Sequence, residues 1–233
     1  MLCLPEVRPR RKGRIDIYVP KENDREPRPA IVFVHGGPLP PELRPTPRDW
    51  PVYVGYGSLA ASRGMVGVTV DHRLHAPANY SIAADDVSRA VAQVRALPEI
   101  DPTRVALWFF SGGGLLSAAW LDEPPTWLRC VALTYPLLAP PAGLDVDARF
   151  RPVEAVGGAR QLPILLTRVG RERAEVAATV EAFTAAAELH GVGIDVIDVP
   201  DGQHGFDMLD HADSSRAAVT EAMNWVTTAL STR

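Results

Sequence analysis

The fold of this chain is decided by the stretch LWFFSGGGLLSAAW, from Leu107 to Trp120, in which bulky apolar residues lead through one serine into three consecutive glycines. The apolar residues before Ser111 predict a buried strand, and the residues after the glycines predict the start of a helix. Ser111 then lies in the sharp turn between strand and helix, where a residue can be forced to a positive φ angle. The glycines allow the helix to begin close to the strand, so that the Ser111 hydroxyl stands above the sheet and the Gly112 amide points toward negative charge. This arrangement is typical of a nucleophile.

Three other interpretations of the glycine-rich turn compete with a nucleophile. A phosphate-binding P-loop requires a lysine after the glycines, and Leu115 stands there instead. A dinucleotide-binding turn follows the first strand of its domain, whereas this turn follows about the fourth. Glycines that merely allow tight packing beside an incidental serine remain an open alternative, so the rest of the chain has to decide.

Short β-branched runs alternate along the chain with longer segments of helical period, which is typical of βα units around a mostly parallel sheet. The predicted strands, about seven in number, span residues 14–19, 30–35, 65–71, 105–110, 130–134, 163–169 and 194–199. Most of them are apolar on both faces, as central parallel strands are when helices cover both sides of the sheet. Three apolar stripes predict helix faces packed on that sheet: Val87, Val91 and Val94; Val176, Val180, Phe183 and Ala187; and Val219, Met223, Val226 and Leu230.

Length and composition favour a single domain spanning residues 1–233, because α/β folds of this size commonly form one core and 46% of the residues are hydrophobic. Six prolines in residues 36–51 predict a stiff proline-rich loop over the end of the sheet. Residues 136–161 are too few for a large cap domain and are expected to form a short lid segment.

Charge and targeting signals restrict the partners. A net charge of −4 gives no electrostatic reason to expect a nucleic acid, and the basic run from Arg8 to Arg14 is interpreted as a solvated edge. No apolar run reaches the length of a membrane span, and the N-terminus lacks the order of a signal peptide. Cys3 and Cys130 cannot form a disulfide framework. We therefore expect a cytoplasmic protein with a small-molecule substrate and no membrane partner, and we leave room for a homodimer.

A serine hydroxyl is a weak nucleophile unless a base accepts its proton and an acid orients that base. His204 follows the last predicted strand, in a polar turn between Gly202 and Gly205. Glu172 follows the strand before it, where its carboxylate can reach the imidazole. The remaining candidate acids are Asp145, Asp198 and Asp201. The chain order Ser111, Glu172, His204 is the nucleophile, acid and base order of one particular fold.

Metal and cofactor sites have little support in the sequence. His72 and His75 form an HxxH pair, but no third ligand is identifiable, and the cysteines stand in no zinc-binding spacing. We expect neither a metal nor an organic cofactor.

Five motifs occur in one order along the chain: HGGP at residues 35–38, GVTVDHRLH at 67–75, DPTRVALWFFSGGG at 101–114, LLTRVGRE at 165–172 and DGQHGFD at 201–207. Together they resemble the α/β-hydrolase superfamily, and in particular its compact members, the dienelactone hydrolases and small carboxylesterases. The resemblance runs from about Arg14 to Leu230 and implies the α/β-hydrolase fold without a large cap domain. It implies Ser111 as nucleophile, His204 as general base and acid, Glu172 as orienting carboxylate, and the Gly37 and Gly112 amides as oxyanion donors.

Three positions depart from the family pattern. Phe109 stands two residues before the serine, where the family usually has a glycine, and its ring needs room beside the turn. Pro38 replaces a further glycine and has no N–H, so Gly37 becomes the expected donor from this loop. Glu172 replaces the commoner aspartate and is one methylene longer.

The implied chemistry is acyl transfer from a small, fairly hydrophobic ester, thioester or lactone, through an acyl-enzyme on Ser111. Aromatic residues near the elbow and the proline-rich loop are the expected lining of the substrate pocket, namely Trp50, Tyr53, Phe109 and Phe110. The alternative is a non-hydrolytic use of the same fold, either ligand binding or proton-transfer chemistry by His204 such as cyclisation or elimination. Phe109 and Pro38 are the features that favour this alternative.

Overall fold

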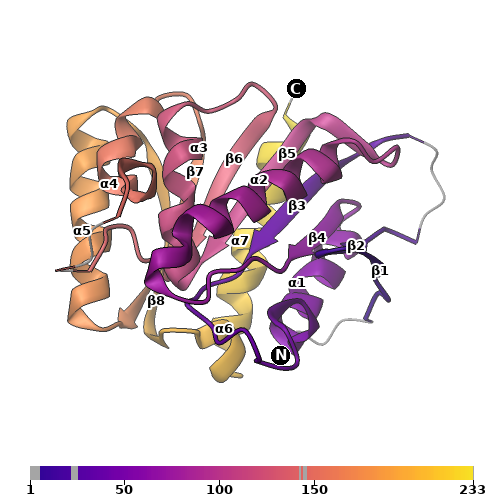
Figure 1. The fold of residues 1–233 in the computed structure, drawn as a ribbon, viewed down its shortest axis with the longest axis horizontal. Coiled ribbons are helices and arrows are strands. Elements are labelled where there is room, and N and C mark those ends of the chain that lie inside the picture. The colour runs from indigo at the N-terminus through magenta and orange to yellow at the C-terminus, as the bar shows by residue number, and fades with distance from the viewer. Residues whose placement is uncertain (1–5, 22–25, 142, 144–145, 233) are drawn as a thin grey trace.

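One eight-stranded sheet forms the centre of the protein in the computed structural model, which describes residues 6–21, 26–141, 143 and 146–232 (Figure 1). Its strands, in chain order, are β1 (Arg10–Lys12), β2 (Ile15–Tyr18), β3 (Arg28–Val34), β4 (Val66–Val70), β5 (Ile100–Phe110), β6 (Leu128–Thr134), β7 (Ile164–Arg171) and β8 (Ile194–Gln203). In space the order is β1-β2-β4-β3-β5-β6-β7-β8. The strands from β3 to β8 are parallel, and β1 and β2 add an antiparallel edge. A mostly parallel sheet places the ends of β3, β5, β7 and β8 at one edge, where the candidate site lies.

The sheet has one strand more than predicted. Each of the seven predicted strands overlaps an observed one, and the extra strand is β1, which lies inside the basic run. Its three residues are all exposed, so it carries none of the apolar alternation by which a strand is predicted. Arg11 of β1 donates to Asp16 of β2 over 2.8 and 2.6 Å. The interpretation of this run as an edge agrees with its place, since charged residues keep edge strands from pairing with other chains.

Helices cover both faces of the sheet (Figure 1). They are α1 (Pro51–Ser62), α2 (Tyr80–Arg95), α3 (Ala118–Asp122), α4 (Pro152–Ala155), α5 (Ala174–Leu189), α6 (Phe206–Leu209) and α7 (Asp213–Ser231). Buried residues of α1 and α7 join one core, and those of α2, α3, α4 and α5 join the core on the other face. The three predicted apolar stripes are the buried faces of α2, α5 and α7.

Helix α1 was absent from the elements predicted. Its apolar and small residues lie on all sides, so no stripe identifies it, and two glycines weaken the helical pattern. The structure explains one of these glycines: a side chain at Gly57 would overlap the ring of Tyr18 in β2. The helix therefore packs unusually close to the sheet.

Short 3₁₀ turns shape the connections. They are η1 (Pro47–Asp49), η2 (Pro77–Asn79), η3 (Ser111–Ser117), η4 (Ala148–Phe150) and η5 (Val156–Gly158). The proline-rich loop contains η1 and ends where α1 begins. The described part of residues 136–161 contains η4, α4 and η5, all short, and residues 142, 144 and 145 lie outside the described residues.

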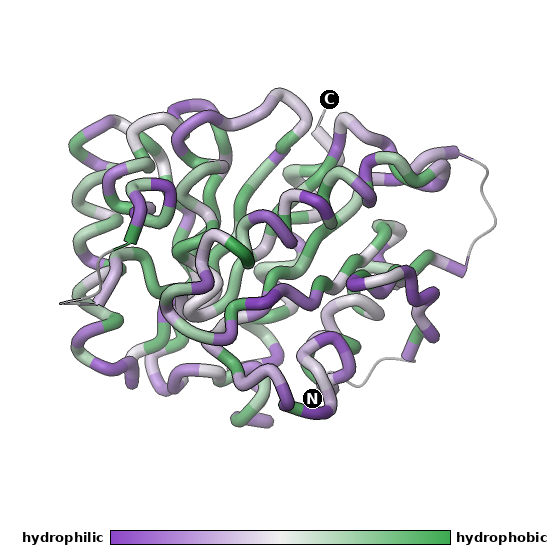
Figure 2. The backbone as a smooth tube through the Cα atoms, viewed as in Figure 1, coloured by the Kyte–Doolittle hydropathy of each residue, from purple (hydrophilic) through white to green (hydrophobic). Residues whose placement is uncertain are grey.

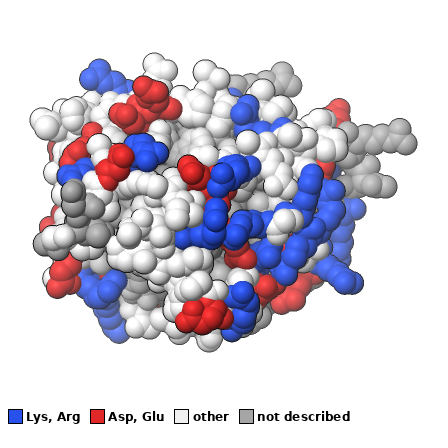
Figure 3. All heavy atoms as spheres, viewed as in Figure 1, with Lys and Arg blue, Asp and Glu red and all other residues white. Residues whose placement is uncertain are grey.

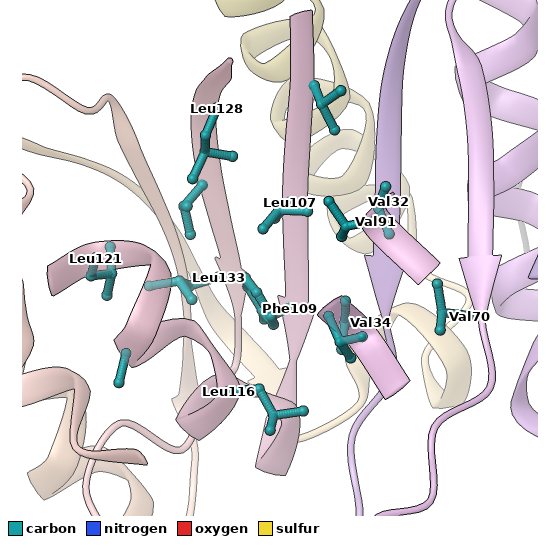
Figure 4. Close-up of a cluster of buried hydrophobic side chains, with 14 of the residues drawn as sticks. Val32, Val34, Val70, Val91, Leu107, Phe109, Leu116, Leu121, Leu128 and Leu133 are labelled. Carbon is teal, nitrogen blue, oxygen red and sulfur yellow. The ribbon is translucent and has the colours of Figure 1, made fainter. Parts of the chain in front are cut away.

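Alternate side chains of β5 enter the two cores. Leu107 and Phe109 belong to the core on the α2 side, and Trp108 and Phe110 to the core on the α7 side. In Figure 4, Leu107 and Phe109 lie beside side chains of the neighbouring strands such as Val34 and Leu133. Hydrophobic residues make up most of the central strands (Figure 2). Burying each of these large side chains contributes on the order of 1.5–3 kcal/mol to folding.

Basic side chains gather on the half of the surface that lies over β1 and β2 (Figure 3). Several arginines of the described residues form ion pairs: Arg11 with Asp16 and Asp49, Arg48 with Asp71, and Arg73 with Asp86. Among the described helices, none combines the length and hydropathy that crossing a membrane requires.

Candidate active site

Ser111 occupies the turn after β5 with a φ of +51°, as the glycine-rich sequence predicts. The three glycines that follow are required by close approaches between backbones. A side chain at Gly112 would overlap the carbonyl oxygen of Gly37, and one at Gly113 would overlap that of His35. The segment after β5 is therefore pressed against the loop that follows β3.

The prediction of a helix directly after the glycines needs correction. Residues Ser111–Ser117 form the 3₁₀ helix η3, and α3 begins only at Ala118 and ends at Asp122. Three successive glycines are poor α-helix formers, and the Ser117 hydroxyl bonds the Gly114 carbonyl over 2.7 Å. The tighter turn still holds the Ser111 side chain at the edge of the sheet.

Strands β7 and β8 bring Glu172 and His204 together. Arg171, the last residue of β7, pairs with Gln203, the last residue of β8. Glu172 and His204, which follow them, therefore lie at the same level. The register shifts just before this pair, at Gly170, where a side chain would overlap the Pro200 carbonyl oxygen. Strand β8 extends through Gly202 to Gln203, and His204 and Gly205 form the turn that follows, so the predicted polar turn begins later than expected. The shift in register allows Arg171 to pair with Gln203, so Glu172 and His204 both follow directly after one pair of residues.

Ser111, His204 and Glu172 form one hydrogen-bonded row. The Ser111 Oγ lies 2.7 Å from His204 Nε2, and His204 Nδ1 lies 2.6 Å from Glu172 Oε2. The other carboxylate oxygen of Glu172 accepts a 2.8 Å hydrogen bond from the Arg173 amide. The Glu172 side chain is 6% exposed and that of His204 is 26% exposed, so the acid is shielded while the imidazole can meet a ligand.

The remaining candidate acids are engaged elsewhere or lie outside the described part of the chain. Asp198 forms a two-pronged pair with Arg168, and Asp201 bonds Arg171. Asp145 lies outside the described residues. Of the four acids considered from the sequence, Glu172 is the one that the structure places against His204.

The predicted amide donors, Gly37 and Gly112, lie next to each other at this edge. The Gly112 amide is in the first turn of η3, where a helix offers no internal acceptor. In the described structure the Gly37 amide donates to no backbone carbonyl. Tyr80 of α2 donates from its hydroxyl to the Gly112 carbonyl over 3.0 Å and so fixes the peptide plane of the elbow.

His35 and His72 form a buried stacked pair beside this loop, with ring centroids 3.7 Å apart. His35 Nδ1 donates to the Gly36 carbonyl over 2.5 Å, and His72 Nε2 donates to the His35 carbonyl over 2.9 Å. The other ring nitrogens accept from the amides of His72 and Leu74, both over 3.4 Å. Each ring thus has one donor and one acceptor, which is the neutral form.

The HxxH sequence at His72 and His75 is accounted for by these contacts, because His75 Nδ1 lies 2.9 Å from the Leu39 carbonyl oxygen. Within the described residues, no group of three or more His, Cys, Asp or Glu side chains is placed to hold a metal ion.

The predicted pocket residues are distributed between loop and core. Trp50 is half-buried and donates to the Pro45 carbonyl over 2.9 Å, and Tyr53 is buried in the first turn of α1. Phe110 is buried edge-on against Tyr53, with centroids 5.3 Å apart. Phe109 is fully buried in the core on the α2 side, so its assignment to the pocket is corrected: the ring fills space between strands and helices and does not face a ligand.

Sequence reasoning overlooked Tyr135, the first residue after β6. Its φ is +36°, and its ring lies 4.9 Å from that of His204. Its place at the carboxyl end of a parallel strand is the signal that could have singled it out.

Comparisons with known proteins concern the fold and the first part of the chain. The BD-FAE family model matches residues 15–120, less than half of the chain, and this range includes Ser111 and Gly37 but neither Glu172 nor His204. Curated protein sequences give no match.

Solved structures resemble almost the whole chain. Thermogutta terrifontis esterase 2 with propionate bound has a TM-score of 0.70 and 19% sequence identity, over 92% of this chain and 88% of that chain. The butyrate-bound form has a TM-score of 0.69 and 19% identity over the same shares. The form phosphorylated by paraoxon has a TM-score of 0.70 and 18% identity, again over 92% and 88%. The strand order, the helices on both faces of the sheet and these structural similarities together show that the chain has the α/β-hydrolase fold.

Proposed function

We propose that the protein is a serine hydrolase that cleaves small esters through an acyl-enzyme on Ser111. The observation that carries the proposal is the row of 2.7 and 2.6 Å contacts from Ser111 through His204 to Glu172. The three side chains come from the ends of β5, β7 and β8, and such a row is what nucleophilic catalysis by a serine requires.

The proton path follows from the two contacts. His204 keeps a proton on Nδ1, and this N–H forms a hydrogen bond to the Glu172 carboxylate. The lone pair of Nε2 therefore faces the Ser111 hydroxyl. When Ser111 Oγ attacks the ester carbonyl, Nε2 takes the hydroxyl proton and then gives it to the leaving alcohol. Water next attacks the acyl-enzyme, with Nε2 again accepting and returning the proton, and the acid is released.

The negative charge that forms on the carbonyl oxygen needs donors in place before the reaction. The Gly112 amide and the Gly37 amide are the proposed donors, and the close packing of these two residues supports this role. Losing one such donor costs about 100- to 1000-fold in turnover.

The proposed substrates are esters, thioesters or lactones with short acyl chains. The described part of the segment between β6 and β7 contains only short helices, which leaves the site without a large cover. The similar esterase 2 has structures with propionate and with butyrate bound, both short acids. Trp50 and Tyr53 remain the proposed aromatic surroundings of the acyl group. Phe110 is 1% exposed and packs against Tyr53 in the core on the α7 side, so it supports this wall from behind. A cytoplasmic location remains a proposal, and so does a homodimer.

Hydrolysis of p-nitrophenyl acetate, butyrate and octanoate by purified protein tests the proposal. We expect the two shorter esters to be preferred, and we expect Ser111→Ala and His204→Ala to lower kcat by about 10⁴-fold or more. The matched controls Ser62→Ala and His190→Ala change exposed residues outside the site and should keep wild-type rates. A folded Ser111→Ala protein with wild-type turnover would contradict the proposal, and folded wild-type protein inert toward all three esters would favour ligand binding or proton-transfer chemistry.

A further inference from the structure

Asp207 joins three elements of the fold directly behind His204. It lies in the short helix α6, and its Oδ1 accepts a 2.7 Å hydrogen bond from the Tyr135 hydroxyl. Its Oδ2 accepts a 2.9 Å hydrogen bond from the Tyr56 hydroxyl of α1. Both carboxylate oxygens are therefore held by side chains that come from distant parts of the chain.

Tyr135 links this carboxylate to the imidazole. Its ring lies 4.9 Å from the His204 ring at 56° to it, and 5.9 Å from the Phe206 ring at 87°. Gly205, with a left-handed φ of +76°, precedes the first residue of α6, so the helix that carries Asp207 begins directly after the turn at His204. Three links therefore form a closed ring of contacts: the backbone from His204 to Asp207, the hydrogen bond from Tyr135 to Asp207, and the contact between the rings of Tyr135 and His204.

Ser111 and Glu172 restrain the two nitrogens of the imidazole. The tilted Tyr135 ring packs against the imidazole and adds a third restraint on its orientation. Resting on the proposed hydrolase function, we propose that Asp207 is a positioning residue for His204, acting through Tyr135 and itself held in place by Tyr56. Its negative charge also favours the imidazolium that forms when Ser111 gives up its proton.

The two tyrosine hydroxyls are the hydrogen-bond donors to Asp207. Burial, followed by the nearby charge of Asp207, raises the pKa values of Tyr135 and Tyr56 far above the usual value, so both hydroxyls stay protonated and donate. Burial raises the pKa of Asp207 on balance, and the hydrogen bonds from the Tyr135 and Tyr56 hydroxyls limit that rise by stabilising the carboxylate.

Other titratable groups also face this cluster. Glu172 from the end of β7 faces His204, and Tyr53 of α1 faces the tyrosines and Asp207. On its far side Asp207 lines a cavity of about 290 Å³ between α1, α6 and α7, whose other charged or titratable residues include Glu6, Asp210, His211 and Arg216. Effects of Asp207 on His204 must therefore be separated from general effects of burial and charge.

Two substitutions separate positioning from folding. Asp207→Asn removes the charge and leaves one oxygen to accept from the tyrosines, and Tyr135→Phe keeps the ring and removes only the hydroxyl. Tyr18→Phe is the matched control, because Tyr18 is also a buried tyrosine but lies in β2, three strands from β5.

With p-nitrophenyl butyrate we expect Asp207→Asn and Tyr135→Phe to lower kcat by about 10- to 100-fold with KM within about twofold, because a misplaced base slows chemistry more than binding. We expect Asp207→Asn to move the acid limb of the kcat/KM profile to lower pH, since the imidazolium loses a neighbouring negative charge. Asp207→Glu, which keeps the charge, should restore the position of that limb. Tyr18→Phe should match the wild type in both measurements.

The titration of His204 observed by NMR on histidine-labelled protein makes the inference independent of turnover. A midpoint that falls in Asp207→Asn supports the inference even if no ester is hydrolysed, in which case the proposed function alone fails. Unchanged kcat, pH limb and His204 midpoint in Asp207→Asn, even with reduced stability, overturn the inference. If Asp207→Asn does not fold, Tyr135→Phe decides, and wild-type kcat in that variant overturns it.

Discussion

Phe109 stands two residues before Ser111, at a position where the α/β-hydrolase superfamily usually has a glycine. The structure accommodates the ring by turning it into the core between Val34 and Leu133, and it is fully buried there (Figure 4). The apolar space on the α2 side of the sheet thus resolves the doubt that the sequence raises about this position. The residue contributes to stability, and the elbow retains its positive φ at Ser111.

Replacing Phe109 with alanine should therefore act on folding. We expect Phe109→Ala to lower the free energy of unfolding by about 3–5 kcal/mol, because it removes a buried aromatic ring and leaves a cavity. Urea unfolding measures this loss, and KM for p-nitrophenyl butyrate in the folded protein should stay within about threefold of the wild type. Unchanged stability together with a large rise in KM would instead assign Phe109 to the substrate pocket.

At the scale of elements, the ends of β3 and β4 are coupled by the stacked pair of His35 and His72. The pair holds the carbonyls of His35 and Gly36 just before Gly37, the proposed oxyanion donor. Burial lowers the pKa of His35 to about 4, and burial followed by the neighbouring His35 lowers that of His72 well below its usual value. The connection after β3 is thus built around two neutral imidazoles.

This pair predicts a loss of stability in mild acid. Below the ordinary histidine pKa of about 6.5 the unfolded chain binds protons that the folded pair excludes, so the free energy of unfolding falls as the pH drops. The loss is about 1.4 kcal/mol per pH unit for each excluded proton, and for His35 it continues down to a pH of about 4. Urea unfolding between pH 7.5 and 4.5 measures the slope, which His72→Gln should reduce and the exposed control His190→Gln should leave unchanged. Equal slopes in the wild type and His72→Gln would contradict the assignment.

The titration of Asp86 lies below the pH range in which this slope is measured. Burial raises its pKa, but hydrogen bonds from Arg73 and Arg89 outweigh that effect and bring the value to about 2. A carboxylate with a lowered pKa loses its contribution only as the pH falls below its ordinary value of 3.8 toward about 2, which lies under the range of the experiment.

At the scale of the whole molecule, the sequence predicts the sheet better than its edges. Apolar runs at Ala30, Val105 and Ile164 mark central strands because both faces of those strands are buried. Strand β1 lacks an apolar run because its three residues are all exposed, so the sequence does not predict it. Helix α1 lacks an apolar stripe because its apolar and small residues lie on all sides.

The candidate site follows the same division. Ser111, Glu172 and His204 could be chosen from the sequence, since each follows a predicted strand and parallel strands end at one edge. The pairing of Arg171 with Gln203 brings Glu172 and His204 to the same level. This pairing depends on the shift in register and could not be predicted from the sequence. Asp207 and its two tyrosines come from three elements and carry no shared motif, so only the folded structure brings them together.

The whole account depends on Ser111 being a nucleophile activated by His204. Labelling with a fluorophosphonate probe, followed by mass spectrometry of the tryptic peptide from Val105 to Arg129, measures this most directly. We predict one label per chain on Ser111, no label in Ser111→Ala, labelling slowed by at least about 1000-fold in His204→Ala, and wild-type labelling in His190→Ala. An unlabelled Ser111 in folded wild-type protein, or labelling that proceeds at the same rate without His204, would contradict it.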